Sequence, residues 1–174
     1  KINYSLLYII IYCLNVNEFV PISTNKFKKT LGSFATGVTV VTTFLDNKPY
    51  GLTVNAFSSL SLDPPLILIC IDKKSESNKI LKRSKIFAVN ILNKNQKHLS
   101  KIFSDSTNRN RFDKVKTTKK ITGSPIIANS LGYIDCTVEK IISAGDHNIF
   151  IGKIELLNNK NLDPLIYYRG NYLE

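Results

Sequence analysis

Short runs of β-branched and aliphatic residues, each bounded by turn signals, constrain the fold of this chain most strongly. One run covers residues 38–45 (VTVVTTFL), and β-branched residues favour a pleated strand. The segment 46–49 (DNKP) that follows is typical of a turn. A second run, residues 66–71 (LILICI), follows two prolines and predicts a fully buried strand. Both runs indicate a fold built on sheets.

Further strands are predicted around these two runs. One starts near Tyr50, continues into the Ser-rich segment 58–61 and stops at residues 63–65 (DPP), because two prolines cannot continue a ladder of hydrogen bonds. In the segment 134–139, apolar and polar residues alternate, which is the pattern of a half-buried strand. Gly145-Asp146 is the predicted turn before the last strand. The remaining predicted strands cover residues 86–92 and 148–157.

Only short helices are predicted between the strands. Ser23 or Thr24 can cap the first helix, which Gly37 is expected to end. Ser75 is the expected cap of the second helix. The polar, basic segment 104–120 is predicted to be a loop. The second and third helices are predicted over residues 76–83 and 95–103.

At least six strands with only small helices predict an all-β fold, a closed or partly closed antiparallel barrel rather than an alternating α/β sheet. With 174 residues the chain is expected to form one domain, residues 23–174, after an uncertain N-terminal extension, residues 1–22. The apolar run 4–14 is too short to span a bilayer. It is interpreted either as the apolar part of a signal peptide or, more simply, as the product of a truncated or over-extended reading frame.

The charge balance and the cysteine and histidine counts disfavour several function classes. There are 24 Lys and Arg against 13 Asp and Glu, a net charge of +11, but the lysines are scattered and form no basic helix. We therefore predict no nucleic-acid or membrane partner. Three cysteines without a C-x-x-C pair and only two histidines predict reduced thiols and no metal site. The body of the chain is predicted to be cytoplasmic.

Phosphate-binding motifs of the common kinds are absent. The chain has no G-x-G-x-x-G after a strand and no P-loop, so any bound phosphate must be held by loop amides, hydroxyls and Lys or Arg side chains. Residues 53–59 (TVNAFSS) and 72–77 (DKKSES) offer such groups. Taken singly, each segment is better explained as a turn or a solvated loop with a helix cap.

Five segments occur in an order that is highly specific in combination: FKKTLGSFATGVTVVTT from Phe27, YGLTVNAFSSLSLDPPLILICIDKKS, FAVNILNKNQKHLSKIF, GDHNIFIGKIELL and PLIYYRGNY. This order, over about residues 26–172, resembles the flavin reductase family, whose members supply reduced flavin to two-component monooxygenases. The resemblance implies an antiparallel split β-barrel of Greek-key topology, of the FMN-binding type. It also implies a homodimer with the flavin near the subunit interface.

The resemblance assigns roles to residues that are unremarkable by themselves. It implies that the flavin ring and ribityl chain contact Thr53, Val54, Asn55, Ala56, Ser58 and Ser59, and that Cys70 and Asp72 pass beside the ring. Lys74, Ser75 and Ser77 would hold the flavin phosphate, and Arg111 would reach a phosphate or the nicotinamide dinucleotide. His147 would position the nicotinamide, with Tyr168 packed near the site. Without the resemblance, His147 would be interpreted as an exposed turn histidine.

The implied activity is hydride transfer from NADH or NADPH to FMN or FAD, followed by release of reduced flavin to a partner monooxygenase. Such a transfer needs accurate positioning and exclusion of water rather than acid or base groups. Two other functions remain open from the residues alone. One is a flavin-binding module that retains FMN as a prosthetic group for electron relay or sensing, and the other is a basic β-barrel that binds nucleic acid through aromatic side chains.

Overall fold

The computed structural model describes residues 21–173. The apolar run 4–14 and most of the predicted N-terminal extension lie outside these described residues. Contacts divide the chain into two units, residues 1–34 and 35–174, and each is considered by itself. Within the described part of the chain, no helix is long and apolar enough to cross a membrane.

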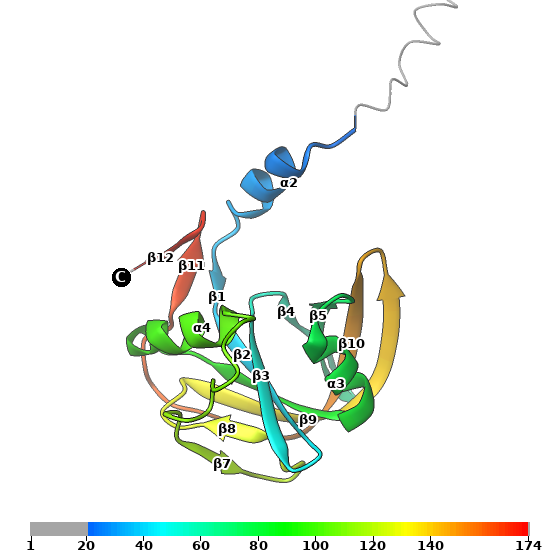
Figure 1. Cartoon of the computed structure of the whole chain (residues 1–174), viewed down its shortest axis with the longest axis vertical. Helices are drawn as coiled ribbons and strands as arrows, with labels where there is room; N and C mark the ends of the chain where they lie inside the picture. Colours follow the sequence, from blue (N-terminus) through cyan, green and yellow to red (C-terminus); the bar gives the residue numbers. More distant parts are fainter. Residues whose placement is uncertain (1–20, 174) are drawn as a thin grey trace, which may run out of the picture. The chain divides into compact units, whose positions relative to one another are not determined.

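The first unit contains one described helix, α2 (Thr24–Leu31) (Figure 1). Its predicted start is confirmed, because the Ser23 hydroxyl accepts a hydrogen bond from the Lys26 amide at 3.2 Å. Its predicted end at Gly37 is wrong, since the helix stops at Leu31 with Gly32 as its cap. After the helix, Ser33 N donates to Thr30 O at 3.1 Å, a hydrogen bond to the third residue before it rather than the fourth. This tighter turn ends the helix.

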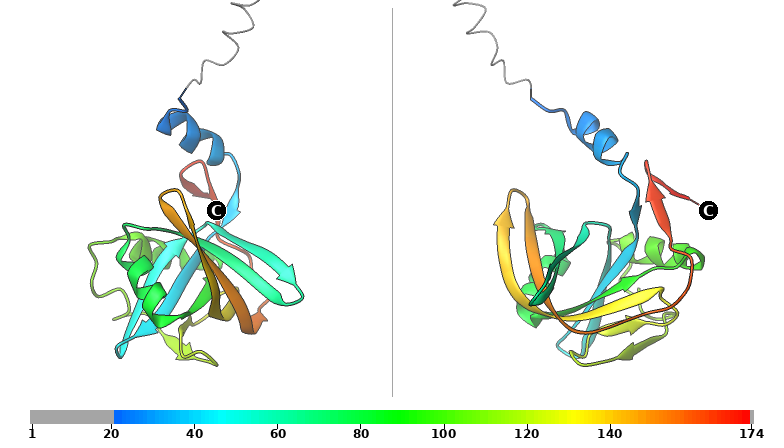
Figure 2. Two further views of the ribbon diagram at one scale, coloured as in Figure 1. Left: turned by 90° about the vertical axis from the view of Figure 1, so that its right-hand side faces the viewer. Right: turned by 180° about the vertical axis from the view of Figure 1, so that it is seen from behind.

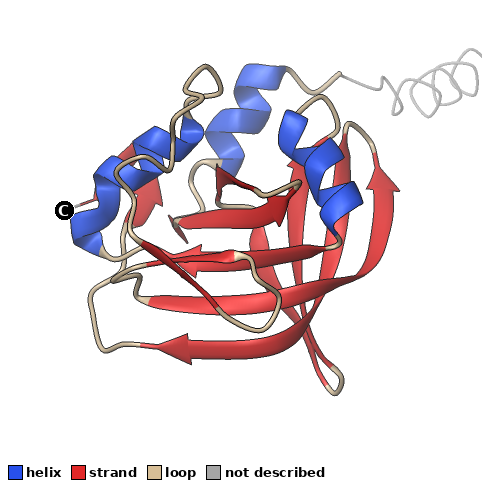
Figure 3. Ribbon diagram, turned by 60° about the horizontal axis from the view of Figure 1, so that its bottom comes forward, coloured by secondary structure: helices blue, strands red, loops and turns tan. Residues whose placement is uncertain are grey.

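The second unit is built on an antiparallel sheet of seven strands in the order β3-β2-β6-β9-β10-β5-β4 (Figures 1 and 3). Its long central strands β9 and β10 curve along their length (Figure 2). These seven strands are β2 (Thr39–Leu45), β3 (Lys48–Val54), β4 (Phe57–Leu62), β5 (Pro65–Asp72), β6 (Ile86–Ile91), β9 (Gly132–Ala144) and β10 (His147–Asn159). The expectation of a mostly antiparallel β fold is therefore confirmed.

Two smaller sheets and the remaining helices complete this unit. The order of the three-stranded sheet is β1-β11-β12, and β7 pairs with β8. Their bounds are β1 (Thr36–Gly37), β11 (Ile166–Tyr168), β12 (Asn171–Leu173), β7 (Thr117–Lys119) and β8 (Pro125–Ile127). The helices are α3 (Glu76–Ser84), the short 3-10 helix η2 (Lys94–Gln96) and α4 (Lys97–Ser104).

The turn between β2 and β3 is tighter than predicted. Asp46 and Asn47 have φ angles of 49° and 61°, so both central residues are left-handed, as in the two-residue turns that join twisted strands. Asp and Asn tolerate this conformation better than most residues. Lys48 and Pro49, expected in the turn, instead begin β3.

The strand predicted from Tyr50 to Ser61 is in fact two strands, interrupted at Asn55 and Ala56. The reason is the sheet order, because β3 pairs with β2 at one edge while β4 pairs with β5 at the other. The chain must change partners between them. Sequence composition does not reveal this change, since both halves have strand-like residues.

The prediction of a fully buried strand at residues 66–71 is also wrong. In β5, Ile67, Ile69 and Ile71 are at most 3% exposed, whereas Leu66, Leu68 and Cys70 between them are partly exposed. The inner face of the sheet packs against the core and the other face is only partly covered within this unit.

The predictions for the second and third helices hold with small differences. Ser75 caps α3, and its hydroxyl accepts a hydrogen bond from Ser77 N at 3.1 Å. The segment 95–103 divides into η2 and α4. The predicted loop 104–120 ends in strand β7, whose three residues are all exposed and therefore carry no alternating pattern to detect.

The alternation of buried and exposed side chains predicted for residues 134–139 fails at Asp135. Its side chain was expected on the solvent face of the strand, but it is 0% exposed. Its carboxylate accepts hydrogen bonds from the Thr122 amide at 3.0 Å and from the Thr122 hydroxyl. The loop that ends at Ser124 covers this face of β9 and satisfies the carboxylate.

Candidate functional site

The segment that ends β3 opens into a cavity of about 260 Å³. We call this cavity the cradle; its lining residues are Val38, Thr53, Asn55, Ser100, Ser104, Tyr167 and Tyr172. The Thr53 hydroxyl donates to Ser100 O at 2.6 Å, and the Ser100 hydroxyl lies 2.7 Å from the Tyr172 hydroxyl. Strand β3, helix α4 and strand β12 are thereby joined around a set of neutral hydroxyl and amide groups.

Thr36 adds a polar group that the sequence did not single out. Its hydroxyl oxygen is buried and has no hydrogen-bond partner among the described residues. Thr36 is paired in the sheet with Tyr167, which lines the cradle. A buried hydroxyl without a partner is costly unless a ligand or water satisfies it, so Thr36 is a polar group beside the cradle, although it is not among the residues that line it.

The other predicted ring and ribityl residues follow the cradle along the chain. Val54 is 6% exposed and belongs to the core, and its carbonyl oxygen accepts a bond from Thr39. The Ala56 carbonyl accepts from Cys70 N at 3.0 Å, which places Cys70 beside this segment. Ser58 and Ser59 lie exposed on the edge strand β4. These residues therefore offer backbone groups and surface hydroxyls rather than lining the cradle.

Residues Asp72 to Ser77 form a compact turn that leads into α3, and we call this the phosphate turn. The Asp72 carboxylate accepts from Lys74 N at 2.8 Å, and the Asp72 carbonyl accepts from Ser75 N at 3.1 Å. These bonds fix the turn and leave the Lys74 side chain exposed. A lysine and hydroxyl groups at a helix N-terminus favour an anion, as predicted for this segment.

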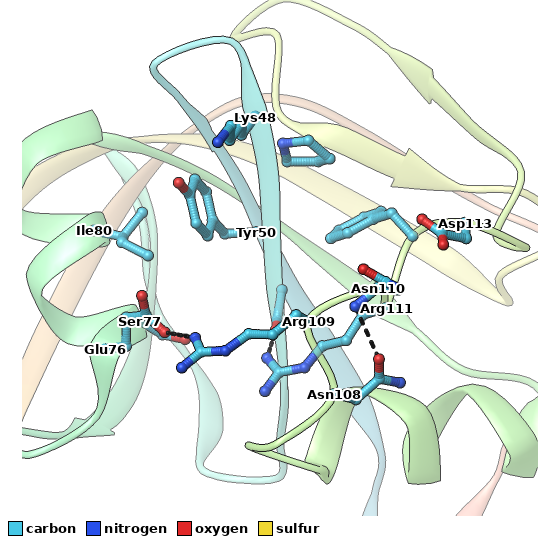
Figure 4. A pocket seen from close by; sticks show the side chains of 13 residues that line it. Lys48, Tyr50, Glu76, Ser77, Ile80, Asn108, Arg109, Asn110, Arg111 and Asp113 are labelled. Carbon is cyan, nitrogen blue, oxygen red and sulfur yellow. Dashed lines mark hydrogen bonds and ion pairs between the residues drawn. The ribbon is translucent and has the colours of Figure 1, made fainter.

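A second cavity of about 260 Å³ adjoins the phosphate turn through Ser77 (Figure 4). The β2-β3 hairpin, α3 and the loop 108–113 line it, and we call it the hairpin cavity. Arg109, which was not predicted, forms an ion pair with Glu76 of α3 at 2.8 Å. The predicted Arg111 donates to Gly51 O at 2.6 Å and to Asp105 O at 2.7 Å and 3.0 Å, so its bonds in this structure anchor the loop.

His147 lies at the start of β10, directly opposite Asp72 of β5 in the sheet register. Its Nδ1 is 2.7 Å from a carboxylate oxygen of Asp146. This hydrogen bond from His147 is the main cause that lowers the pKa of Asp146. With Nδ1 bonded to the carboxylate, Nε2 of a neutral imidazole is left as an acceptor, and the half-exposed ring is reachable.

The turn before His147 is held against the phosphate turn. Lys73 N donates to Asp146 O at 2.9 Å, and the Lys73 ammonium donates to Gly145 O. The two predicted functional segments, far apart in the sequence, are therefore brought together by β5 and β10. The phosphate turn and His147 therefore belong to one candidate site.

Tyr168 lies outside the lining of the cradle. Side chains of successive strand residues point to opposite faces, and in β11 it is the neighbouring Tyr167 that lines the cradle. The Tyr168 ring is 5.1 Å from the Arg169 guanidinium carbon. Of the closing aromatic motif, the residues nearest the cradle are thus Tyr167 and Tyr172.

The described cysteines are not activated. Burial raises the pKa of the Cys136 thiol to about 12, and burial also raises the pKa of Cys70. A nucleophilic cysteine needs the opposite shift. Residues 21–173 also contain no group of three His, Cys, Asp or Glu side chains placed to hold a metal ion. Binding and orientation, rather than nucleophilic attack by a thiol, are what these residues offer.

Ser100 and Arg109 are functional candidates that the sequence analysis missed. Ser100 is a polar residue on the buried face of α4, between Leu99 and Phe103, and that position was a detectable signal. Arg109 lies in a polar loop where only the folded structure shows its proximity to α3. Both extend the predicted site.

Comparison with known proteins identifies the family of this chain. Residues 31–174 match the family described as flavin reductase like domain. The chain is 39% identical over 87% of its length to the flavin-dependent monooxygenase reductase subunit HsaB of Rhodococcus jostii, covering 77% of that protein. It is 36% identical to the NADH-dependent FMN reductase SmoA of Agrobacterium fabrum, covering 91% of each chain.

A solved structure supports the fold. The Streptomyces globisporus NADH:FAD oxidoreductase SgcE6, in complex with NAD and FAD fragments, superimposes with a TM-score of 0.82 at 31% identity. The match covers 86% of this chain and 91% of that one. The family match extends over most of the chain and includes both the phosphate turn and the His147 turn. This chain belongs to the flavin reductase like domain family.

Proposed function

We propose that this chain is the reductase component of a two-component monooxygenase, which reduces FMN or FAD with NADH or NADPH and supplies the reduced flavin to a partner oxygenase. The observation that carries this proposal is the pairing of β5 with β10, which places the phosphate turn beside His147. A bound flavin supplies the ring that accepts a hydride. The relatives named as monooxygenase reductase subunits and as an FMN reductase support the same reaction class.

The residues around the cradle fit a flavin by their chemistry. Neutral hydroxyl and amide groups of Thr53, Asn55 and Ser100 suit the carbonyl and nitrogen edge of a flavin ring and its ribityl hydroxyls. Backbone groups of Val54 and Ala56, with Ser58 and Ser59, would extend this contact along the chain.

The phosphate turn would hold the flavin phosphate through Lys74, Ser75 and Ser77. A charge-assisted bond from Lys74 and the N-terminus of α3 both favour a phosphate there. The hairpin cavity shares Ser77 with this turn, so Arg109 and Arg111 lie where a second phosphate group would pass. We assign them to dinucleotide binding, with Arg111 also anchoring the loop.

His147 would orient the nicotinamide, with Asp146 holding the imidazole by its Nδ1. Nε2 then accepts a hydrogen bond from the carboxamide of the nicotinamide. Hydride transfer would require no general acid or base from the protein; a bound flavin and a bound nicotinamide would supply the reacting rings, and these residues would hold them close together. The task of these side chains is to hold both rings and to exclude water.

Replacing His147 with Ala is expected to raise the KM for NADH about tenfold, since one oriented hydrogen bond is worth about 1.4 kcal/mol. The Kd for FMN should change less than twofold. Steady-state kinetics and flavin fluorescence titration measure the two constants. Replacing the exposed His98 with Ala is the matched control, and kinetics for H147A equal to those of this control would remove His147 from the site.

Purified protein mixed with NADH or NADPH and each of FMN, FAD and riboflavin tests the function directly. Flavin absorbance should bleach catalytically under anaerobic conditions. Reduced flavin should leave the protein, so dialysis should strip flavin from it. Absence of turnover with every pair would refute the reductase function, and flavin that survives dialysis would favour a prosthetic group in an electron-relay module.

The fold and the assembly are also proposals. We propose that the bent seven-stranded sheet is a split barrel of Greek-key topology and that two copies form a homodimer. Large apolar side chains are exposed in a single chain, with Leu62 of β4 97% exposed and Phe34 78% exposed. We further place the protein in the cytoplasm, where NADH and NADPH are available to it.

The homodimer predicts a mass of twice 19.6 kDa in light scattering after gel filtration. Leu62→Lys should shift this mass toward that of a single chain, because a charge cannot be buried unpaired in an apolar interface. Lys79→Glu is a control with a charge change at an exposed helix position. A wild-type protein that elutes with the mass of one chain would contradict the homodimer.

A further inference from the structure

Two buried asparagines connect the two halves of the site. Asn78 of α3 and Asn148 of β10 are each 2% exposed. Asn148 Nδ2 donates to Asn78 Oδ1 at 2.9 Å, and Asn78 Nδ2 donates to Ile71 O at 3.0 Å. The end of β5, the first turn of α3 and the start of β10 are therefore joined by side-chain hydrogen bonds in a place without solvent.

Each bonded residue is the direct neighbour of a residue in the site. Ile71 precedes Asp72, where the phosphate turn begins, and Asn148 follows His147. The sheet register pairs the same residues, Asn148 with Ile71 and His147 with Asp72. A displacement of the asparagine pair would thus move the α3 end of the phosphate turn, which carries Ser77, relative to His147.

Helix α3 packs on the core through Ile80 and Leu81, and the asparagine pair adds buried hydrogen bonds at the end nearest the site. Its other end is held by a hydrogen bond of 2.8 Å between the hydroxyls of Thr43 and Ser84. At the first turn, the bond from Asn78 to Ile71 O is buried, whereas the ion pair of Glu76 with Arg109 is exposed and contributes little. The ladder between β5 and β10 fixes the strands but not the helix that carries Ser77.

We propose that Asn78 and Asn148 are positioning residues for the reductase reaction: they hold the phosphate turn and His147 in one fixed relation. A flavin bound by its phosphate then presents its ring at the distance at which His147 orients the nicotinamide. The proposal rests on the proposed function. Its physical basis is that a misplacement of about 1 Å is enough to cost about 100-fold in rate.

Asn78→Ala and Asn148→Ala test the proposal against Asn90→Ala as a matched control. Asn90 is also a buried asparagine, 0% exposed, with bonds to Val40 O at 3.1 Å and from Ile127 N at 2.7 Å, but it lies in β6 outside both halves of the site. All three variants should lower the Tm. Only the first two should raise the Kd for FMN and lower kcat/KM for NADH, each by about tenfold.

The pair should also behave as a unit. The double variant Asn78→Ala/Asn148→Ala should lose no more in kcat/KM than Asn78→Ala alone, because the bond between them is already broken in the single variant. Full additivity of the two losses would show that the residues act separately and would overturn the proposed connection.

Asn78→Asp tests the role of hydrogen bonding, because the substitution changes the hydrogen-bonding groups and leaves the volume of the side chain nearly the same. An ionised carboxylate keeps the bond from Asn148 but repels Ile71 O, whereas a protonated carboxyl donates to Ile71 O and restores both bonds. Burial favours the protonated form. The FMN affinity of this variant, relative to wild type at the same pH, should therefore recover as the pH falls. The neighbouring charged and titratable groups Asp72, Lys74, Glu76 and His147 are present in both proteins, so the comparison with wild type isolates the substituted side chain.

Two results would overturn the positioning role. One is a fall in Tm for Asn78→Ala and Asn148→Ala like that of Asn90→Ala, with the Kd for FMN, kcat and KM unchanged. The other is an affinity of Asn78→Asp that does not depend on pH relative to wild type. A wild-type protein that fails to reduce any flavin would instead refute the proposed function, so the two failures are distinguishable.

Discussion

Lys74→Glu is expected to raise the Kd for FMN about 100-fold while leaving the Kd for riboflavin within twofold of the wild-type value. The substitution removes a charge-assisted bond and adds a negative charge beside the phosphate, and each effect contributes about tenfold. Riboflavin has the same ring and ribityl chain but no phosphate. Comparing the Kd for FMN with the Kd for riboflavin therefore separates the contribution of the phosphate turn from that of the cradle.

Flavin fluorescence quenching measures both constants. Lys79→Glu, at an exposed position in the same helix, is the matched control for the change in net charge, and it should alter FMN binding much less. Raising the ionic strength should weaken FMN binding to the wild type and should leave riboflavin binding unchanged. Equal losses for FMN and riboflavin would show that Lys74 supports the fold of the turn rather than the phosphate.

Gly152→Val is expected to lower the free energy of unfolding by about 3 kcal/mol, with a fall in Tm of about 10 °C. A Cβ at Gly152 would lie 2.4 Å from Cζ of Phe87 and 3.1 Å from Cβ of Cys136. Both neighbours are 0% exposed, so neither side chain has space to move aside. The register also shifts between Ile151 and Gly152, where the strand is already irregular.

Urea unfolding measures this loss. Gly37→Ala is the control, because a Cβ there meets nothing within 4 Å, and its stability should remain within about 0.5 kcal/mol of wild type. Combining Gly152→Val with Phe87→Leu should recover part of the loss, since the shorter side chain vacates the position of Cζ. A Gly152→Val protein as stable as wild type would mean that the ring of Phe87 does not pack across β9 onto β10.

Where local chemistry decides the conformation, the sequence was a good guide. The cap of α3 follows from Ser75, and the turn between β2 and β3 follows from Asp46 and Asn47. Both depend only on residues a few positions apart. The same holds for the runs of β-branched residues that became β2 and β5, although the exposure of one face of β5 did not follow from its composition.

The site itself could be predicted only in pieces. The order of the motifs singled out the phosphate turn, Arg111, His147 and Tyr168, whereas in the structure Tyr167 lines the cradle and the hydrogen bonds of Arg111 anchor a loop. Thr36 and Asn148 gave no signal at all. Thr36 stands out because its buried hydroxyl has no hydrogen-bond partner among the described residues. Asn148 stands out because it donates a buried hydrogen bond to Asn78.

By itself, then, the sequence determined the β-rich class of this protein, its turns and caps, and its family, because these depend on local backbone preferences and on the order of motifs. Only the tertiary structure decided that Asp72 lies opposite His147 and that Thr53 bonds to Ser100 of α4. Contacts of this kind depend on the register of strands distant in the sequence and on buried polar groups finding partners. No local pattern encodes those partners, and the proposed reductase site is made of them.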